Sequence, residues 1–538
     1  MIRHYLVHRK WVLFWSLFLF GVTLIPYLLG YALEEPAWRY AGFVFGVEDG
    51  NSYIAKMLMG ANGDWLFRTP YTTLEQPGVL AFLPYIMLGK LSSAPGQHEQ
   101  LAALFQGFRL FGIIIYCLAT FDFLQHFTSQ QNLIRWGVVI SCVGGGLGWL
   151  TLFGLKGSGF NGLPIDLYSP ESFGFMSLLG LPHLAVSRGL LLWGFGLFAR
   201  KERTLPPWKN GLVIGILWLM MGFFQPLSVV TAWAGLGGAW LVAYGVQVVG
   251  EKRWVNPVTN PLLREWFITA AIAVGISSFW VFYNVAALLN NPFLKGWSEQ
   301  NIILSPGFFD YLLGFSLLLI PAGLGTWKVF KNRNAPGYLL VGFALLFPLL
   351  AYFPINLQRR LPDGIWVVLA ALAIIGLGEM SKRWRNRLLI LGALGILTSL
   401  FLLLGGTLSS LNRSEPVYVE GGKIRAFEAL AEDWQDTTRK PVLLANFVTS
   451  NEAPAWVYLN VLIGHGPESV GIKDLLGPVD DLLGATILNE EQLRFIQEKR
   501  VDYILLEKAN LPVSWSKVGE LIYHEAGIWL IRVSGQVE

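Results

Sequence analysis

Long apolar runs alternate with short polar connections over most of the chain. The runs are typically about 20 residues long, the length that an α-helix needs to cross roughly 30 Å of hydrocarbon at a rise of about 1.5 Å per residue. From them we predict about eleven membrane-spanning helices. They cover residues 11–33, 103–125, 135–154, 176–198, 209–227, 229–247, 266–288, 308–330, 337–355, 364–380 and 387–409. The expected fold is an α-helical polytopic membrane protein.

Clusters of lysine and arginine follow four of these runs. The clusters are Arg200, Lys201 and Arg203; Lys252 and Arg253; Lys328, Lys331 and Arg333; and Lys382, Arg383, Arg385 and Arg387. Such residues accumulate on the cytoplasmic side of membrane helices, and with these spans all four clusters fall on the side of the N-terminus. We therefore expect a multi-pass protein of the plasma membrane whose N-terminus is cytoplasmic.

The apolar stretch from Val79 to Leu91 is not counted as a span. It is short, contains Pro84, and is more typical of a helix that lies in the membrane interface. Counting it as a span would put all four basic clusters outside. We therefore predict a long first external loop over residues 34–102, and the spans that follow then put the C-terminal region outside as well.

The region from residue 411 to 538 has a different pattern, charged and divided into short runs. VYVE, PVLLANF, VDYILLE and GIWLIRV have the composition of strands, whereas GKIRAFEALAEDW, IKDLLGPVDDLLG and NEEQLRFIQEKR have helical periodicity. We predict a soluble, extracytoplasmic α/β domain that follows a transmembrane module over residues 1–410.

Composition supports the membrane assignment and limits the partners. Hydrophobic residues make up 54% of the chain, charged residues 14%, and the mean hydropathy is +0.49, which is more apolar surface than one soluble core can bury. The formal net charge of +4 is small, so we expect the lipid bilayer, and no nucleic acid, as a partner. The two cysteines, Cys117 and Cys142, lie inside apolar runs and predict neither a disulfide framework nor a metal cluster.

The first external loop carries two adjacent carboxylates, Glu48 and Asp49, followed by Tyr53 and Lys56 one helical turn apart. Paired carboxylates beside the bilayer can bind a divalent cation such as Mg²⁺ or Mn²⁺, or act as a general base, because the lipid boundary desolvates them. Tyr53 and Lys56 are candidate substrate-binding residues on the same segment. The alternative is structural, with Asp49 or Asn51 capping a helix that begins near Ser52.

A second acidic loop follows the third predicted span. It contains Asp166 and Glu171, and His183 lies at the mouth of the next span. With the first loop, these residues could hold a metal or an acceptor hydroxyl, so all three are candidate substrate-binding residues. An ordinary polar loop capped by Ser169 or Glu171, with His183 as a hydrogen-bonded residue at a helix end, explains the pattern equally well.

Arg359 and Arg360 lie in a predicted external loop, FPINLQRRLPDG, on the side where basic residues are depleted. Two guanidinium groups at the lipid surface can hold a phosphate or pyrophosphate in bidentate fashion. The alternative is that they reach outer-leaflet headgroups and bind no substrate. Both interpretations stay open.

Together these segments resemble the GT-C superfamily of membrane glycosyltransferases, within a looser group of uncharacterised bacterial polytopic proteins. The matching segments are VEDGNSYIAKM, GDWLFRTPYT, PGVLAFLPYIMLGKL, PESFGFMSLLGLPHLA, NLQRRLPDG and GHGPES. The resemblance implies a polyprenyl-phosphate-linked sugar as donor. It also implies that Asp49, with Glu48, is the base or the metal ligand that activates the acceptor hydroxyl, and that Arg359 and Arg360 hold the lipid phosphate in the same pocket.

Two functions compete at this point. The first is transfer of a sugar from a polyprenyl-phosphate donor to an acceptor on the extracytoplasmic side. The second is a non-catalytic accessory or scaffold protein whose external α/β domain binds a protein partner. A transporter is a weaker third candidate, because no pair of Gly/Pro-broken spans occupies matching positions in two halves of the chain.

Overall fold

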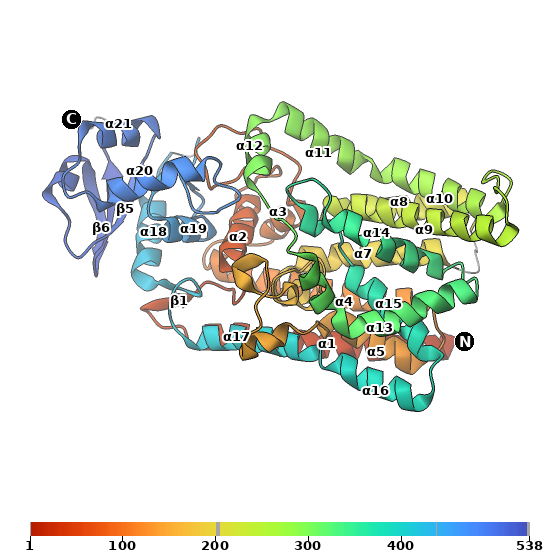
Figure 1. Cartoon of the computed structure of the whole chain (residues 1–538). Helices are drawn as coiled ribbons and strands as arrows, with labels where there is room; N and C mark the ends of the chain where they lie inside the picture. The colour runs from red at the N-terminus through yellow and green to blue at the C-terminus, as the bar shows by residue number, and fades with distance from the viewer. Residues whose placement is uncertain (1, 201–204, 437, 535–538) are drawn as a thin grey trace. The chain divides into compact units, whose positions relative to one another are not determined.

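The computed structural model describes residues 2–200, 205–436 and 438–534, most of them in helices (Figure 1). The chain forms two units. Unit 1 contains the residues up to Leu24, Phe108–Ala286 and Ile302–Gly405, and unit 2 contains Ile25–Gly107, Ala287–Asn301 and the residues from Gly406 onward. The chain passes between the units within α1 (Ile2–Ala32), α4 (Gln97–Leu124), α11 (Phe279–Asn290) and α17 (Ile396–Leu411), and once more between Asn301 and Ile302.

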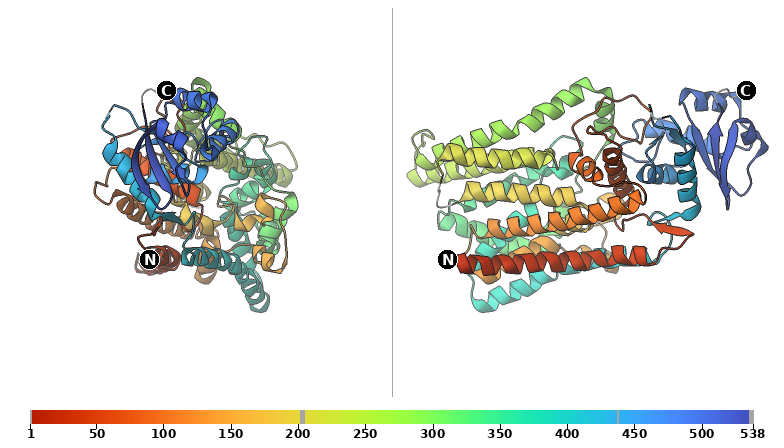
Figure 2. Two further views of the ribbon diagram at one scale, coloured as in Figure 1. Left: turned by 90° about the vertical axis from the view of Figure 1, so that its left-hand side faces the viewer. Right: turned by 180° about the vertical axis from the view of Figure 1, so that it is seen from behind.

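Unit 1 is helical. Its α-helices are α5 (Gln131–Val143), α6 (Gly174–Gly180), α7 (Pro182–Ala199), α8 (Pro207–Gly222), α9 (Leu227–Glu251), α10 (Pro261–Ser277), α13 (Phe308–Lys331), α14 (Gly337–Ala351), α15 (Ile365–Gly378) and α16 (Lys382–Ala393). Its 3-10 helices are η1 (Gly148–Phe153), η2 (Phe160–Gly162), η3 (Ile165–Leu167) and η4 (Gln358–Arg360). Helix α8 packs on α7 and α10, α14 on α9, and α15 on α13 (Figures 1 and 2).

The predicted helical membrane fold is confirmed, but the count of eleven spans is not. Each predicted span overlaps a helix, and among the residues that the structure describes, seven helical stretches are long and apolar enough to cross a membrane. They are Arg9–Ala32, Gln97–Leu124, Leu227–Glu251, Pro261–Asn290, Phe308–Lys331, Gln358–Gly378 and Lys382–Leu411. The sidedness of the termini stays a prediction, and Lys201 and Arg203 of the first basic cluster lie outside the described residues.

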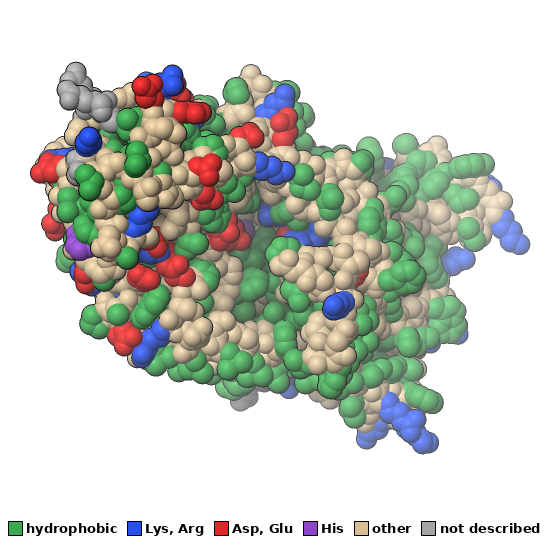
Figure 3. All heavy atoms as spheres, turned by 60° about the vertical axis from the view of Figure 1, so that its left-hand side comes forward, with side chains coloured by type: hydrophobic (Ala, Val, Ile, Leu, Met, Phe, Trp, Pro, Cys, Tyr) green, Lys and Arg blue, Asp and Glu red, His purple; other side chains and the backbone are tan. Residues whose placement is uncertain are grey.

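Surface composition differs between the two units. Many large apolar side chains of the helices are exposed, for example Phe14 at 67% and Phe282 at 72%. On the face drawn in Figure 3, the helices carry chiefly hydrophobic side chains, whereas the C-terminal sheet domain carries many charged ones. A face of this kind is stable against lipid and costly in water, which agrees with the membrane assignment.

Unit 2 joins the predicted first loop to the predicted C-terminal domain. Its loop elements are β1 (Trp38–Tyr40), α2 (Val47–Ala61) and α3 (Leu83–Gly89), and α12 (Pro292–Gln300) also belongs to it. Strand β1 pairs antiparallel with β2 (Tyr418–Glu420), at the start of the C-terminal region. The stretch predicted to be an interfacial helix is indeed a short helix, α3.

The sheet domain contains α18 (Gly421–Asp433), β3 (Val442–Leu444), α19 (Phe447–Trp456), β4 (Asn460–Val461), α20 (Ile472–Gly484), α21 (Glu490–Glu498), β5 (Tyr503–Glu507), η5 (Val513–Lys517), β6 (Gly519–Glu525) and β7 (Ile528–Val533). The strand order is β4-β3-β5-β7-β6, with β3 parallel to β4 and β5, and β7 antiparallel to β5 and β6 (Figure 2). The predicted α/β domain is therefore confirmed. The run VYVE is a strand, but it pairs with β1 outside this sheet.

Both faces of the sheet are covered, which explains why its central strands are apolar without interruption. Along β5, Tyr503 and Leu505 join a core with α18 and α19, whereas Ile504 and Leu506 join a core with α20 and α21. Alternate residues of a strand point to opposite faces, so a strand buried on both sides needs apolar residues at every position. This three-layer arrangement gives the loop after β4 a rigid support.

Candidate active site

Helix α2 presents the two predicted catalytic carboxylates. It begins at Val47, after Gly46 in a left-handed conformation with φ of 57°, and no side chain caps its N-terminus. Glu48 and Asp49 therefore lie in the first turn, where the positive end of the helix dipole favours a carboxylate. The alternative that Asp49 caps a helix beginning near Ser52 is wrong, because the helix begins five residues earlier.

The two carboxylates meet the loop Gly464–Ser469, which follows β4 and has the sequence GHGPES. We call this segment the GHGPES loop. The Asp49 side chain is 58% exposed, and its Oδ1 lies 3.2 Å from Nε2 of His465. The Glu48 side chain accepts a hydrogen bond from the backbone N–H of Gly466 at 2.7 Å. The candidate base is thus held against a second segment more than 400 residues away in sequence.

A buried ion pair lies beneath these contacts. Nζ of Lys56 is 2.6 Å from Oε1 of Glu468, and the two side chains are only 1% and 3% exposed. The hydroxyl of Ser52 donates to the same carboxylate at 2.7 Å and that of Thr69 at 2.5 Å. A buried carboxylate needs several partners of this kind to stay ionised.

The electrostatics of Glu468 follow from this set of partners. Burial by itself raises the pKa of a carboxyl, but Lys56, His465 and the hydrogen bond from Thr69 together hold the pKa of Glu468 below its ordinary value. Glu468 is therefore a fixed negative charge between the Lys56 ammonium and the His465 ring at neutral pH.

Aromatic rings contact Tyr53 and Lys56, the predicted substrate-binding residues of α2. The ring of Tyr53 stacks on that of Tyr85, with centroids 4.6 Å apart and planes 5° apart. Lys56 lies with Nζ 4.4 Å from the centroid of the Phe82 ring. Helices α2 and α3 approach so closely that a Cβ at Gly60 would lie 1.9 Å from the carbonyl oxygen of Ile86, so glycine is required there.

Helix α2 is also fixed on the sheet domain itself. The Asn51 amide donates to the Asn451 side chain on α19 at 2.8 Å, and the hydroxyl of Tyr71 donates to the Asn451 carbonyl at 3.1 Å. Asn451 in turn donates to the carbonyl of Glu48 at 3.3 Å. The start of α2 is therefore rigid, although the Asp49 carboxylate is exposed.

The donor set required for a divalent cation is not assembled at this site. Over the described parts of the chain, no three His, Cys, Asp or Glu side chains gather in a way that could hold a metal ion. Asp49 contacts His465, and Glu48 contacts a backbone N–H. The predicted Mg²⁺ or Mn²⁺ therefore does not fit these residues as they lie.

The other predicted site residues belong to unit 1. Nε of Arg360 lies 3.4 Å from Oε1 of Glu171, whose side chain is 5% exposed, while that of Arg360 is 34% exposed. The guanidinium of Arg359 lies over the ring of Tyr168 at 4.9 Å from its centroid. The prediction that Asp49 and Arg359 share a pocket joins residues of the two units and stays a prediction.

Asp166 anchors its own loop. Its Oδ2 accepts hydrogen bonds from the backbone N–H groups of Gly146 and Gly148 at 3.0 and 2.9 Å, and from the hydroxyl of Thr398 at 3.0 Å. The side chain is buried. His183 is the second residue of α7 and is half-buried.

A buried ion pair joins Arg188, which the sequence shows as an ionisable residue inside a predicted span, to Asp363, which sequence reasoning missed. Nε of Arg188 donates to Oδ1 of Asp363 at 2.8 Å, and the hydroxyl of Ser228 donates to Oδ2 at 2.8 Å. Arg188 also donates to the carbonyls of Pro170 and Glu171. Neither Ser169 nor Glu171 caps a helix, because α6 begins at Gly174 without a side-chain cap.

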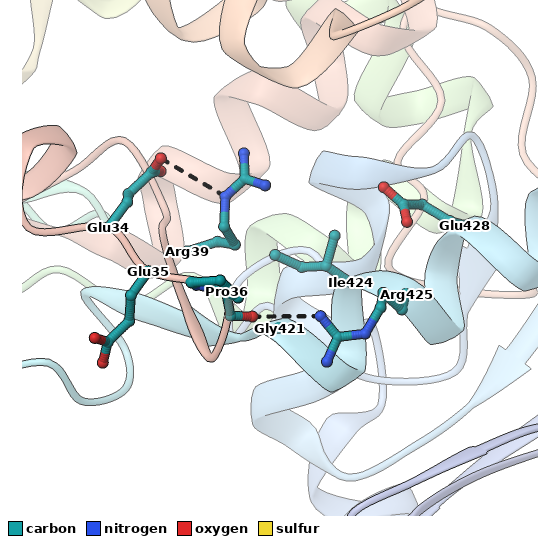
Figure 4. A pocket seen from close by; sticks show the side chains of 8 residues that line it. All are labelled: Glu34, Glu35, Pro36, Arg39, Gly421, Ile424, Arg425 and Glu428. Atoms are coloured by element: carbon teal, nitrogen blue, oxygen red, sulfur yellow. Dashed lines mark hydrogen bonds and ion pairs between the residues drawn. The ribbon is translucent and has the colours of Figure 1, made fainter.

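A separate pocket of about 490 Å³ in unit 2 is lined mainly by charged residues (Figure 4). Its lining residues are Glu34, Glu35, Pro36, Arg39, Gly421, Ile424, Arg425 and Glu428. Arg39 is directed toward Glu34, at 3.6 Å, and also pairs with Glu99 at 2.7 Å. Arg425 donates to the carbonyl of Pro36 and pairs with Glu525. The two guanidinium groups already have anionic partners, so we do not assign this pocket to the chemistry.

The whole chain is similar in structure to several solved membrane enzymes. ArnT from Cupriavidus metallidurans matches with a TM-score of 0.51 at 12% identity, over 96% of this chain and 97% of that one. The oligosaccharyltransferase AglB from Archaeoglobus fulgidus, in complex with an inhibitory peptide and a dolichol-phosphate, matches at 0.50 and 12%, over 97% and 74%. The chain has the GT-C fold. The resemblance inferred from the sequence is thereby confirmed at the level of the fold.

The GT-C fold extends over nearly all of the chain. The arabinofuranosyltransferase AftD from Mycobacteria also matches, with a TM-score of 0.51 and 13% identity, over 97% of this chain and 40% of that longer one. No protein-family model matches the sequence, and no curated protein matches it either. At such low identity the GT-C fold is a statement about architecture, and the chemistry has to be argued from the residues.

Proposed function

We propose that the protein transfers a sugar from a polyprenyl-phosphate donor to an acceptor on the extracytoplasmic side of the membrane. The observation that carries this proposal is the exposed Asp49 carboxylate, held in the first turn of α2 by His465, in a chain with the GT-C fold. The AglB structure with a dolichol-phosphate supports a lipid phosphate as the leaving group.

The proposed step is a displacement at the anomeric carbon. An acceptor O–H loses its proton to the Asp49 carboxylate as the acceptor oxygen forms a bond to that carbon. The bond between the anomeric carbon and the phosphate oxygen breaks, and its electron pair leaves with the polyprenyl phosphate. The negative charge that develops on the leaving group has to be stabilised.

Arg359 and Arg360 are the residues that we propose for this stabilisation. Guanidinium groups bind phosphate oxygens in bidentate fashion and keep their charge at any pH at which the protein is folded. Arg360 is only partly engaged, by Glu171 at 3.4 Å, and Arg359 is stacked on Tyr168. We expect Arg359→Ala to raise the KM for the donor, whereas the control Arg494→Ala, on the exposed surface of α21, leaves it unchanged.

The experiment is a transfer assay on the purified full-length chain. The probes are undecaprenyl phosphate carrying mannose, glucose or arabinose, with a membrane extract as the source of acceptor, and the readout is free undecaprenyl phosphate. Release that requires both the extract and the folded chain supports the proposal. No release with any probe, together with a stable stoichiometric protein complex, contradicts it and supports an accessory or scaffold protein that binds a partner through the α/β domain.

A further inference from the structure

The GHGPES loop is held rigidly on the surface that faces α2. At its first residue, Gly464, φ is +147° and a Cβ would lie 2.6 Å from the backbone of Ser450, so glycine is required there. The side-chain amide of Gln300 donates to the carbonyls of Gly466, Pro467 and Ser469 at 3.2, 2.8 and 3.0 Å. A loop tied down at this many points positions its one histidine precisely enough to affect a neighbour.

His465 lies between two carboxylates. Its Nε2 is 3.2 Å from Oδ1 of the exposed Asp49, and its Nδ1 is 3.9 Å from Oε1 of the buried Glu468. The ring is 4% exposed and lies 5.4 Å, centroid to centroid, from the ring of Tyr71. Nδ1 itself is buried and makes no hydrogen bond. Lys56 and the hydroxyl groups of Ser52 and Thr69 hold the Glu468 carboxylate in its position beside the ring.

The protonation state of the ring decides what it can donate. The imidazolium carries an N–H at both nitrogens, one directed to Asp49 and one toward Glu468. A neutral ring has only one N–H. If that proton is on Nε2, a lone pair faces the Glu468 charge, and if it is on Nδ1, Asp49 loses its donor. The charged ring is therefore the form that donates a hydrogen bond to Asp49 and at the same time presents a positive charge toward Glu468.

The surrounding charges favour that form. Burial acts against a charged ring, and Lys56 repels it, but Glu468 and Asp49 outweigh both and raise the pKa of His465 above its ordinary value. Glu48 on α2 and Tyr71 in the loop after α2 are the other titratable groups near this site. The protonated ring is therefore more favoured here than in a histidine exposed to water.

We propose that His465 is a positioning residue, which in its charged form fixes and orients the Asp49 carboxylate for the acceptor, with Glu468 and Lys56 as the anchor that holds the ring in place. This inference deepens the proposed function and rests on it. The consequence is that transfer depends on a proton outside the reacting groups: as the pH rises and His465 loses that proton, Asp49 loses its fixed donor in a growing fraction of molecules.

Two variants at one position separate this role from a merely structural one. His465→Gln keeps an N–H donor that does not titrate, and His465→Leu removes the donor. We expect the wild-type kcat to fall on the alkaline side, with a midpoint above pH 6.5. We expect His465→Gln to keep kcat within about tenfold and to lose this alkaline fall, and His465→Leu to lose roughly 100-fold in kcat because the base is misplaced. His524→Gln, at an exposed position in β6, is the matched control and keeps the wild-type profile.

A second measurement needs no turnover. The pKa of His465 is measured by NMR on the full-length chain with labelled histidine, with His465→Gln used for assignment. It should fall in Asp49→Asn and fall further in Glu468→Gln, and it should not change in the exposed control Asp474→Asn.

The outcomes are distinguishable. An unchanged His465 pKa in both acid variants, or a His465→Gln enzyme that keeps the alkaline fall, overturns the positioning role. An active His465→Leu enzyme with wild-type kcat overturns it as well. If the wild type releases no undecaprenyl phosphate from any probe at any pH, the proposed function fails, and the NMR measurement alone then decides whether the Asp49–His465–Glu468 arrangement exists.

Discussion

Unit 2 contains two buried glutamate–lysine pairs that differ in their surroundings. In the first, Glu468 lies 2.6 Å from Lys56 and accepts two further hydrogen bonds from hydroxyl groups. In the second, Glu452 lies 3.6 Å from Lys423, and neither of its oxygens accepts a hydrogen bond. Glu415 and Glu507 also pair with Lys423 and compete for its charge.

Because of this difference, the pKa values of the two buried carboxyls are shifted in opposite directions. The partners of Glu468 hold its pKa below the ordinary value, whereas burial, only partly offset by Lys423, raises the pKa of Glu452 to about 8. Glu468 is therefore a charged anchor at neutral pH, and Glu452 largely keeps a proton. What a buried acid does is decided by its hydrogen-bond partners more than by its depth.

The largest expected effect is on stability at the first pair. Glu468→Gln leaves the Lys56 ammonium buried without a counter-charge, and we expect a loss of about 3 kcal/mol in the stability of unit 2. Limited proteolysis and thermal melting of the purified chain measure this loss. Adding Lys56→Met to the variant should recover much of it, because the unpaired charge is then gone. A Glu468→Gln protein as resistant as the wild type would show that the pair is not formed.

Glu452→Gln should lower the stability less than Glu468→Gln does, and it should change how the stability depends on pH. With a pKa of about 8 in the folded chain and an ordinary value of 4.5, the folded state binds a proton that the unfolded chain releases between these values. Stability therefore falls as the pH rises through that window, by about 1 kcal/mol per pH unit. The melting temperature at pH 5 and pH 6 should show this slope in the wild type and a smaller one in Glu452→Gln.

The pH dependence of stability that Glu468 contributes has the opposite sign, so Glu468→Gln is the control for the slope of the melting temperature with pH. Its pKa is lowered, so its contribution to stability is fully present above its ordinary value of 4.5 and is lost only as the pH falls below it. Between pH 5 and pH 6, Glu468→Gln should lower the melting temperature by the same amount at each pH. A Glu452→Gln protein that keeps the full wild-type slope would contradict the assignment of a raised pKa.

The smallest expected effect on stability is at the exposed carboxylates. Asp49→Asn and Asp474→Asn each change an exposed acid in the first turn of a helix, α2 and α20 respectively. We expect each to change stability by less than about 0.5 kcal/mol. If the two variants have equal melting temperatures, Asp49 contributes no more to stability than the control residue Asp474 does.

The helical bundle and the α/β domain could be predicted because they follow from local patterns. Apolar runs of sufficient length predict membrane helices, and β5 and β7 are apolar enough to be recognised as strands. Strand β4, with two residues, is too short to recognise, and β6 carries polar residues along most of its length, as expected for an edge strand. Helix α19 was not predicted from the sequence, because it contains Pro454 and proline is unfavourable inside a helix.

Half of the candidate site could be predicted, and the other half could not. Glu48, Asp49 and Lys56 were identified because they lie in the predicted external loop beside the membrane, where paired carboxylates can act as a base or bind a cation. His465 and Glu468 were noted only as part of the GHGPES segment, because contact over more than 400 residues of sequence leaves no local pattern. One signal was available: Lys56 lies on an otherwise largely apolar helix segment, and a buried lysine requires an acid from elsewhere in the chain.

The measurement that tests the central claim most directly is the single-turnover rate of sugar transfer by Asp49→Asn beside Asp474→Asn, on preparations with matched melting temperatures. Because a general base typically contributes 10²- to 10⁴-fold, we expect Asp49→Asn to lose roughly that factor while Asp474→Asn keeps the wild-type rate. Transfer by Asp49→Asn at the wild-type rate would contradict the account.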